Sequence, residues 1–286
     1  MSVDGIHVTD STVAGRTGHV IPIRDYAPDE VRHTVPLVWV HGGGFMGGGL
    51  DMPESDAVAR AIAHSGRHVR AVDYRLVPMI NFRGTFRPKP SANRYPEPLF
   101  DVLDAYKDLA STQPSTRSPL LGGTSAGAGL SLSAATRLRD GDGPPPSGLA
   151  LIYGTFHGRP VTVTRELRSR IRMSDRAMGI FLGKESLERM NMNYGGSPES
   201  LDDHAVFPGG GDLRGLPQTL VMNADRDSLR ASGDALAQEL IDAGIETTTQ
   251  ILPNTTHGFL NKPKTRHFTD GTHALVTWMD DQKAHQ

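Results

Sequence analysis

The chain of 286 residues, 37% hydrophobic and 22% charged, has the length and composition of a globular protein with one large α/β domain, and not of a disordered, collagen-like or coiled-coil protein. Its 30 basic and 32 acidic residues give a net charge of −2, so the positive excess typical of nucleic-acid-binding proteins is missing. Because the chain has no cysteine, disulfides, thiolate zinc sites, iron–sulfur clusters and cysteine nucleophiles are excluded.

The N-terminal region predicts neither a signal peptide nor a membrane anchor. Residues 1–15 lack a basic start followed by an apolar run, and no apolar stretch approaches the roughly 20 residues needed to cross a bilayer. We therefore expect a cytoplasmic protein without membrane contact. The alternating character of residues 19–24 predicts that the first 34 residues form two antiparallel edge strands.

Strand and helix patterns alternate along the rest of the chain. Short apolar runs predict strands at 35–40, 68–74, 120–121, 149–153, 218–223 and 247–252. Apolar residues at helical spacing predict helices at 54–64, 96–110, 126–138, 229–243 and 267–282. This alternation indicates an α/β fold, a mostly parallel sheet flanked by helices, with its functional site at the carboxyl ends of the strands.

One segment breaks the alternation. Residues 156–207 contain helical patches at 174–182 and 185–190 but no strand pattern, so we expect a single domain over residues 1–286 with a small helical cap inserted at about 156–207. Five arginines between Arg165 and Arg176 are interpreted as a solvated face. The apolar residues expected on the inner side of the cap are Met173, Met178, Ile180, Phe181, Leu182 and Met190.

A candidate nucleophile follows the strand at 120–121. The sequence Gly123-Thr124-Ser125-Ala126-Gly127 fits G-x-S-x-G between a strand and a helix. In that context the glycines permit a tight turn that exposes the serine hydroxyl at a helix N-terminus, where the helix dipole favours negative charge. Ser125 is therefore predicted to be nucleophilic.

A serine nucleophile needs a base and an acid that orients it. The strand at 218–223 leads into a loop with two candidate acids, Asp225 and Asp227, and the strand at 247–252 leads into a loop with His257. Both loops follow carboxyl ends of strands, and the chain order serine, aspartate, histidine is that of the α/β-hydrolase arrangement. Of twelve histidines, His257 is the one in the required place.

Two interpretations fit the glycines after the first buried strand. His41-Gly42-Gly43-Gly44 can bring backbone N–H groups close to a developing oxyanion, because glycines carry no obstructing side chain. The spacing Gly42-x-Gly44-x-x-Gly47 also matches a dinucleotide-binding fingerprint. No helix pattern begins at the second glycine and no acidic residue closes the next strand at the usual spacing, which disfavours the dinucleotide alternative.

Taken together, these motifs make the chain similar to the hormone-sensitive-lipase-like, GTSAG-type bacterial carboxylesterases of the α/β-hydrolase superfamily, from about residue 36 to the C-terminus. The resemblance rests on His41-Gly42-Gly43-Gly44-Phe45, Asp73-Tyr74-Arg75-Leu76-Val77-Pro78, Gly123-Thr124-Ser125-Ala126-Gly127, Leu216-Pro217, Asp227-Ser228-Leu229-Arg230 and His257-Gly258-Phe259.

The resemblance implies a function for each of these sites. It implies a Ser125–His257–Asp227 triad, with Asp227 preferred to Asp225 because the D-x-L-R pattern falls on it. It further implies that the N–H groups of Gly43, Gly44 and Ala126 form the oxyanion hole. The Asp73-Tyr74-Arg75 stretch would be structural, tying the loop beside the oxyanion turn. The stretch 79–95 is longer and more basic than in the family, and only 40 residues precede His41, so we expect residues 156–207 to form most of the cap.

The expected chemistry is hydrolysis of short-chain carboxylic esters through an acyl-enzyme on Ser125, with a small-molecule ester as substrate and no metal or organic cofactor. Amide, formamide or lactone hydrolysis by the same triad stays open, because the sequence does not separate leaving groups. A non-catalytic small-molecule receptor of the same fold is a further alternative, against which the intact triad argues. The sequence leaves the natural substrate and the oligomeric state open, a homo-oligomer included.

Overall fold

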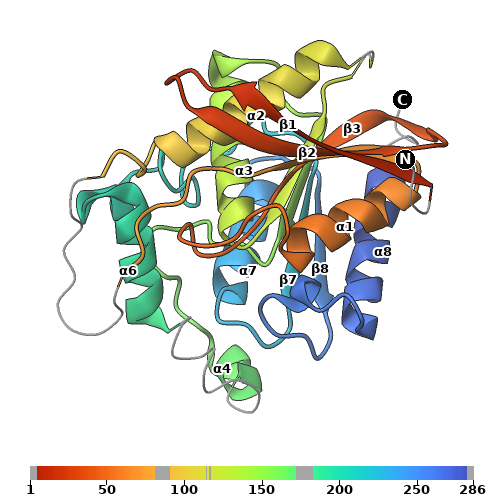
Figure 1. Ribbon diagram of the computed structural model, residues 1–286. Helices are drawn as coiled ribbons and strands as arrows, with labels where there is room; N and C mark the ends of the chain where they lie inside the picture. Colours follow the sequence, from red (N-terminus) through yellow and green to blue (C-terminus); the bar gives the residue numbers. More distant parts are fainter. Residues whose placement is uncertain (1–4, 81–90, 114, 116, 172–182, 282–286) are drawn as a thin grey trace.

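The computed structural model describes residues 5–80, 91–113, 115, 117–171 and 183–281 (Figure 1). In this part of the chain an eight-stranded sheet has the order β1-β2-β4-β3-β5-β6-β7-β8. Strands β3 to β8 are parallel, whereas β1 pairs antiparallel with β2, and β2 with β4. The strands are β1 (Ile6–Ala14), β2 (Val20–Pro28), β3 (His33–Val40), β4 (Arg67–Val72), β5 (Leu120–Thr124), β6 (Leu149–Ile152), β7 (Thr219–Ala224) and β8 (Thr247–Leu252).

Helices cover both faces of the sheet (Figure 1). Side chains of α1 (Pro53–His64) and α8 (Arg266–Asp281) share one apolar core with one face of the sheet. On the other face lie α2 (Glu97–Thr112), α3 (Ala126–Arg137) and α7 (Arg230–Asp242), in a second core. A π-helical turn, η1 (Leu138–Asp142), continues α3, and a 3₁₀ turn, η3 (Phe259–Asn261), precedes α8.

Local sequence explains where these helices begin and which face they bury. Helix α1 begins at Pro53, where the missing N–H costs nothing, and has Glu54 and Asp56 in its first turn, where acidic groups suit the helix dipole. Its apolar residues Val58 and Ile62 recur at helical spacing and are fully buried against the sheet. The same amphipathic spacing underlies α2 and α8, whereas α3 is buried on all sides over its first ten residues.

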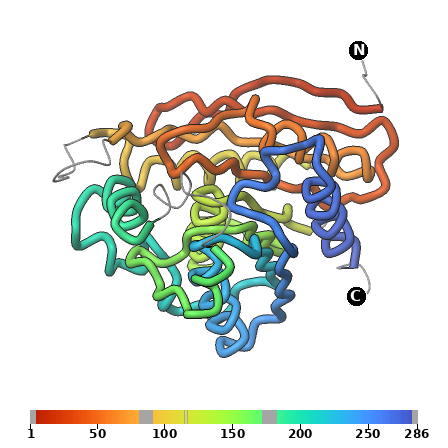
Figure 2. The backbone as a smooth tube through the Cα atoms, turned by 90° about the horizontal axis from the view of Figure 1, so that it is seen from below, coloured from red at the N-terminus to blue at the C-terminus, as the bar shows by residue number. Residues whose placement is uncertain are grey.

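The predicted elements agree with the observed ones within a few residues at each end. The two antiparallel N-terminal strands are confirmed, but only β1 is an edge strand, because β2 also pairs with β4. Figure 2 shows both strands (red) at one end of the molecule, opposite the region of β7, α7 and β8 in lighter blue. Strand β5 extends through the two glycines to Thr124, because central pairing with β3 and β6 holds these residues in the sheet. None of the described helices is both long enough and apolar enough to cross a membrane.

Segment 156–207 contains α4 (Arg165–Ile171), α6 (Lys184–Gly195) and the 3₁₀ turn η2 (Glu199–Asp202), and its described residues form no strand. The helical patch predicted at 174–182 lies outside the described residues, as do Met173, Met178, Ile180, Phe181 and Leu182. Met190 is described and is buried. Arg170 is exposed, as expected for a solvated face, and its guanidinium also pairs with Asp225.

Candidate active site

Ser125 stands at the turn between β5 and α3. Its backbone has a φ of +51°, a conformation that costs energy for a residue with a side chain, and its N–H donates to the carbonyl oxygen of Ile152 at 2.9 Å. A Cβ at Gly127 would collide with the carbonyl oxygens of Val40 and His41, so only glycine lets α3 approach β3 this closely. The turn therefore presents Ser125 at the carboxyl edge of the sheet, as the motif predicts.

A hydrogen-bonded chain connects three of the predicted residues. Ser125 Oγ lies 3.0 Å from His257 Nε2, and His257 Nδ1 lies 2.7 Å from Asp227 Oδ2. The other carboxylate oxygen of Asp227 accepts a bond of 2.9 Å from the N–H of Leu229, which fixes the acid at the start of α7. The loops after β5, β7 and β8 thus bring a nucleophile, a base and an acid together from distant parts of the sequence.

The charges around His257 favour its protonated form. Burial of the ring disfavours the imidazolium and acts to lower its pKa. The charge and hydrogen bond of Asp227, together with the charge of Glu54, outweigh this, so the pKa of His257 is raised above its ordinary value. An imidazole held in this way readily accepts a proton and keeps it while a neighbouring group reacts.

The glycine loop after β3 lies beside Ser125. Gly43, Gly44 and Ala126 line the same cavity as Ser125. Gly43 has a φ of +114°, and a Cβ there would collide with the carbonyl of Gly47, so the loop requires glycine at this position. No helix begins within the loop, since α1 begins only at Pro53, and the dinucleotide alternative is therefore not supported.

The Asp73-Tyr74-Arg75 stretch supports this loop, as the resemblance implied. Tyr74 Oη donates to the carbonyl oxygens of His41 and Gly42 at 3.1 and 3.3 Å, and its ring stacks on His41 at a centroid distance of 4.4 Å. Arg75 pairs with the buried Asp101 of α2 at 2.8 Å. The base of the loop is thereby tied to the main body of the fold.

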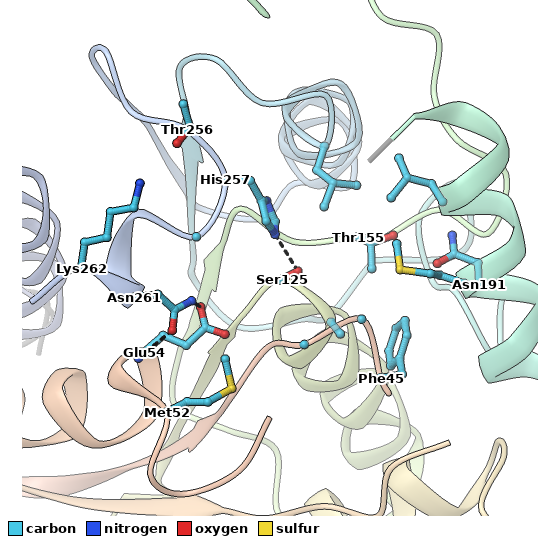
Figure 3. A pocket seen from close by; sticks show the side chains of 17 residues that line it. Phe45, Met52, Glu54, Ser125, Thr155, Asn191, Thr256, His257, Asn261 and Lys262 are labelled. Atoms are coloured by element: carbon cyan, nitrogen blue, oxygen red, sulfur yellow. Dashed lines mark hydrogen bonds between the residues drawn. The ribbon is translucent and has the colours of Figure 1, made fainter. Parts of the chain in front are cut away.

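The cavity above Ser125 has a volume of about 330 Å³. Figure 3 shows the hydrogen bond between Ser125 and His257 at its centre. Helix α6 contributes Leu187, Met190 and Asn191, so segment 156–207 forms part of the wall. The remaining lining residues are Gly43, Gly44, Phe45, Met52, Glu54, Ala126, Thr155, Leu229, Thr256, Gly258, Asn261 and Lys262.

Asp225, the other candidate acid, is bonded elsewhere. Its carboxylate lies 2.7 and 2.6 Å from Arg170 and accepts a bond of 3.0 Å from the N–H of Asn254. The geometry therefore favours Asp227 as the partner of His257.

One buried acid of the site was not predicted from the sequence. Glu54 lines the cavity and is only 2% exposed. In the sequence, Glu54 is recognisable only as an acidic residue in the first turn of the helix that follows the glycine loop. This position marks the start of a helix but does not indicate a place in the active site. Among the described residues, no group of three or more histidine and acidic side chains is arranged to hold a metal ion.

Comparisons with known proteins agree with the fold and the site geometry described above. A family model described as alpha/beta hydrolase fold matches residues 37–261. The carboxylesterase NlhH of Mycobacterium tuberculosis is 30% identical over 252 residues, which cover 84% of this chain and 72% of NlhH. An ethyl acetate hydrolase of Pseudomonas putida is 27% identical over 263 residues, which cover 88% of this chain and 76% of the relative.

Solved structures give a similar result. A hyperthermophilic esterase from the archaeon Pyrobaculum calidifontis matches with a TM-score of 0.80 and 25% identity, covering 97% of this chain and 83% of the other. These matches confirm the fold class predicted from the alternation of strands and helices.

Proposed function

The chain belongs to the alpha/beta hydrolase fold family and is an ester-hydrolysing enzyme similar to hormone-sensitive-lipase-like carboxylesterases, and we propose that it cleaves short-chain carboxylic esters through an acyl-enzyme on Ser125. The observation that carries this proposal is the hydrogen-bonded chain from Asp227 through His257 to Ser125 in the cavity. A receptor that has lost catalysis would not need all three side chains in bonding contact.

The first half-reaction forms the acyl-enzyme. His257 Nε2 takes the proton of Ser125 as Oγ forms a bond to the acyl carbon, and the carbonyl π electrons move to oxygen. The resulting oxyanion is stabilised by the N–H groups of Gly43, Gly44 and Ala126. The C–O bond to the alcohol then breaks, and the alcohol leaves with the proton from His257.

The second half-reaction releases the acid. His257 takes a proton from water, whose oxygen adds to the acyl carbon, and collapse of the intermediate returns the proton to Ser125. Throughout the cycle Asp227 accepts the Nδ1 proton in a hydrogen bond, fixing the imidazole tautomer and stabilising the imidazolium. Every proton in this cycle moves between Ser125, His257, water and substrate.

We extend the proposal to the wall above the site. Segment 156–207 acts as the cap, since Leu187, Met190 and Asn191 of α6 line the cavity with Ser125. A cavity of about 330 Å³ suits a small ester, and one relative is named for the hydrolysis of ethyl acetate. The fold, the site and the cap together form one catalytic domain.

The test is a substrate panel with a matched variant. Short 4-nitrophenyl esters, the corresponding anilides and a set of lactones are offered to the wild type and to Ser125→Ala. The proposal expects turnover of the esters that Ser125→Ala lowers by at least ~10⁴-fold. Lactones or anilides cleaved faster than esters, with the same loss in Ser125→Ala, would keep the mechanism and change the substrate class.

A further inference from the structure

Glu54 is a buried carboxylate in the active site that the reaction scheme does not use. Its Oε1 accepts a hydrogen bond of 2.9 Å from the N–H of Gly42. Its Oε2 accepts bonds from Tyr153 Oη at 3.0 Å and from Asn261 Nδ2 at 2.8 Å. In Figure 3 the side chains of Glu54 and Asn261 lie side by side at the edge of the cavity.

These three partners belong to three different parts of the site. Gly42 directly precedes the two glycines proposed as oxyanion donors. Tyr153 follows β6, and its ring packs edge-on against His257 at a centroid distance of 5.1 Å. Asn261 ends the turn that follows His257, and its amide oxygen also accepts the backbone N–H of Glu54 at 3.3 Å. One carboxylate thus joins the donor loop to the surroundings of the base.

In the described part of the chain, the carboxylate of Glu54 accepts hydrogen bonds from neutral groups, namely a backbone N–H, a phenol and an amide. Among the described side chains, none of the lysines, arginines or histidines forms an ion pair with it within 4 Å. Burial and the neighbouring charge of Glu54 hold the pKa of Tyr153 well above its ordinary range, so the phenol remains a donor. Burying a carboxylate whose hydrogen-bond donors are all neutral lowers the stability of the folded protein, because the charge loses its hydration.

A negative charge at this place interacts favourably with His257 during turnover, because His257 becomes an imidazolium when it takes the proton of Ser125. We propose that Glu54 is a positioning residue that holds the Gly43–Gly44 donor loop through Gly42 and stabilises the imidazolium of His257 through space. The inference rests on the proposed function and adds a second carboxylate to it.

The groups that face His257 come from every element packed around it. Asp227 lies at its Nδ1, Ser125 at its Nε2 and Tyr153 against its ring. Lys262 lines the same cavity, while α6 contributes the uncharged Leu187, Met190 and Asn191. Two negative charges near the ring, those of Asp227 and Glu54, raise the pKa of the imidazole.

The decisive comparison is Glu54→Gln against Asp56→Asn. Both remove one negative charge from the first turn of α1, but Asp56 accepts from Tyr26 at 2.9 Å and pairs with Arg60, away from the reacting atoms. Active sites are counted by titration with an organophosphonate to its end point, so that kcat refers to folded enzyme. Initial rates on a short 4-nitrophenyl ester are then measured across pH for both variants.

For Glu54→Gln we expect kcat to fall about 10- to 100-fold with KM changed much less, because displaced donors weaken transition-state binding. The acid limb of kcat/KM should also move to lower pH by about 0.5 unit or more, because the imidazolium loses a nearby negative charge. Asp56→Asn should retain the wild-type kcat and acid limb. A Glu54→Gln variant with the wild-type kcat and the wild-type acid limb of kcat/KM would overturn the inference.

A second variant keeps the test decisive if Glu54→Gln does not fold. Glu54→Asp retains the charge but is one methylene shorter, so it should keep the acid limb near its wild-type position while kcat falls at least about tenfold. A wild-type kcat in Glu54→Asp would contradict the positioning role. If Ser125→Ala retained activity, the proposed function itself would fail, which is a separate result.

Discussion

Arg170 and Asp225 form a bidentate ion pair, with Nε–Oδ1 and Nη2–Oδ2 distances of 2.7 and 2.6 Å. The guanidinium of Arg170 outweighs the effect of burial and lowers the pKa of Asp225. Asp225 stands two residues before Asp227, and it also accepts the N–H of Asn254 at 3.0 Å, on the loop that leads to His257. Helix α4 is thereby attached to both loops that supply the acid and the base.

This arrangement predicts different consequences for two neighbouring acids. Asp227→Asn should lower kcat by about 10⁴-fold with the fold intact, because the imidazole loses the acceptor that fixes its tautomer. Asp225→Asn should change kcat by less than about tenfold, because Asp225 touches no reacting atom, and the variant should lose thermal stability as α4 is released. Steady-state kinetics and melting curves of the two variants check this. A severe loss of kcat in Asp225→Asn with a mild effect of Asp227→Asn would reverse the assignment.

The raised pKa of His257 determines in which direction the acid limb of kcat/KM is displaced. The imidazole acts as base only when it is neutral, and Asp227 and Glu54 favour the protonated form. We therefore expect kcat/KM to rise with pH through an apparent pKa above about 6.5, the ordinary value for histidine, and then to level off. A pH profile of kcat/KM on a short, non-ionising ester measures it. An acid limb centred well below pH 6 would contradict the electrostatics of the site.

The size of the cavity limits the acyl chain. Each methylene buried from water contributes about 0.8 kcal/mol, or about fourfold in kcat/KM, but only while the cavity of about 330 Å³ can enclose it. We expect a preference for acyl chains of about two to six carbons, with little action on long-chain triglycerides and no activation at an oil–water interface. A series of 4-nitrophenyl esters from acetyl to dodecanoyl tests this. A kcat/KM that still rises at dodecanoyl would require a deeper tunnel.

Much of the fold follows from local patterns. Apolar runs and helical spacing predict the strands and helices because these patterns record which face of each element is buried. The position of Ser125 is predictable because its motif needs only five consecutive residues and their flanking elements. His257 follows from chain order and its place after a strand.

The parts that the sequence did not predict depend on contacts between distant residues. The partners of Glu54 lie 12, 99 and 207 positions away, so no local pattern marks it as part of the site. Arg170 lies 55 positions from Asp225, and a cluster of arginines is by itself typical of a solvated helix face. The choice between Asp225 and Asp227 came from a family resemblance, because both acids stand in the same loop.

The most direct test of the acyl-enzyme mechanism is to trap it. The enzyme is treated with an organophosphonate ester, digested, and mapped by mass spectrometry, with Ser125→Ala treated in parallel. The account predicts one adduct per chain, on the peptide that contains Ser125, with none in Ser125→Ala and complete loss of ester turnover in the labelled enzyme. An adduct on another residue, or near-normal turnover in Ser125→Ala, would contradict it.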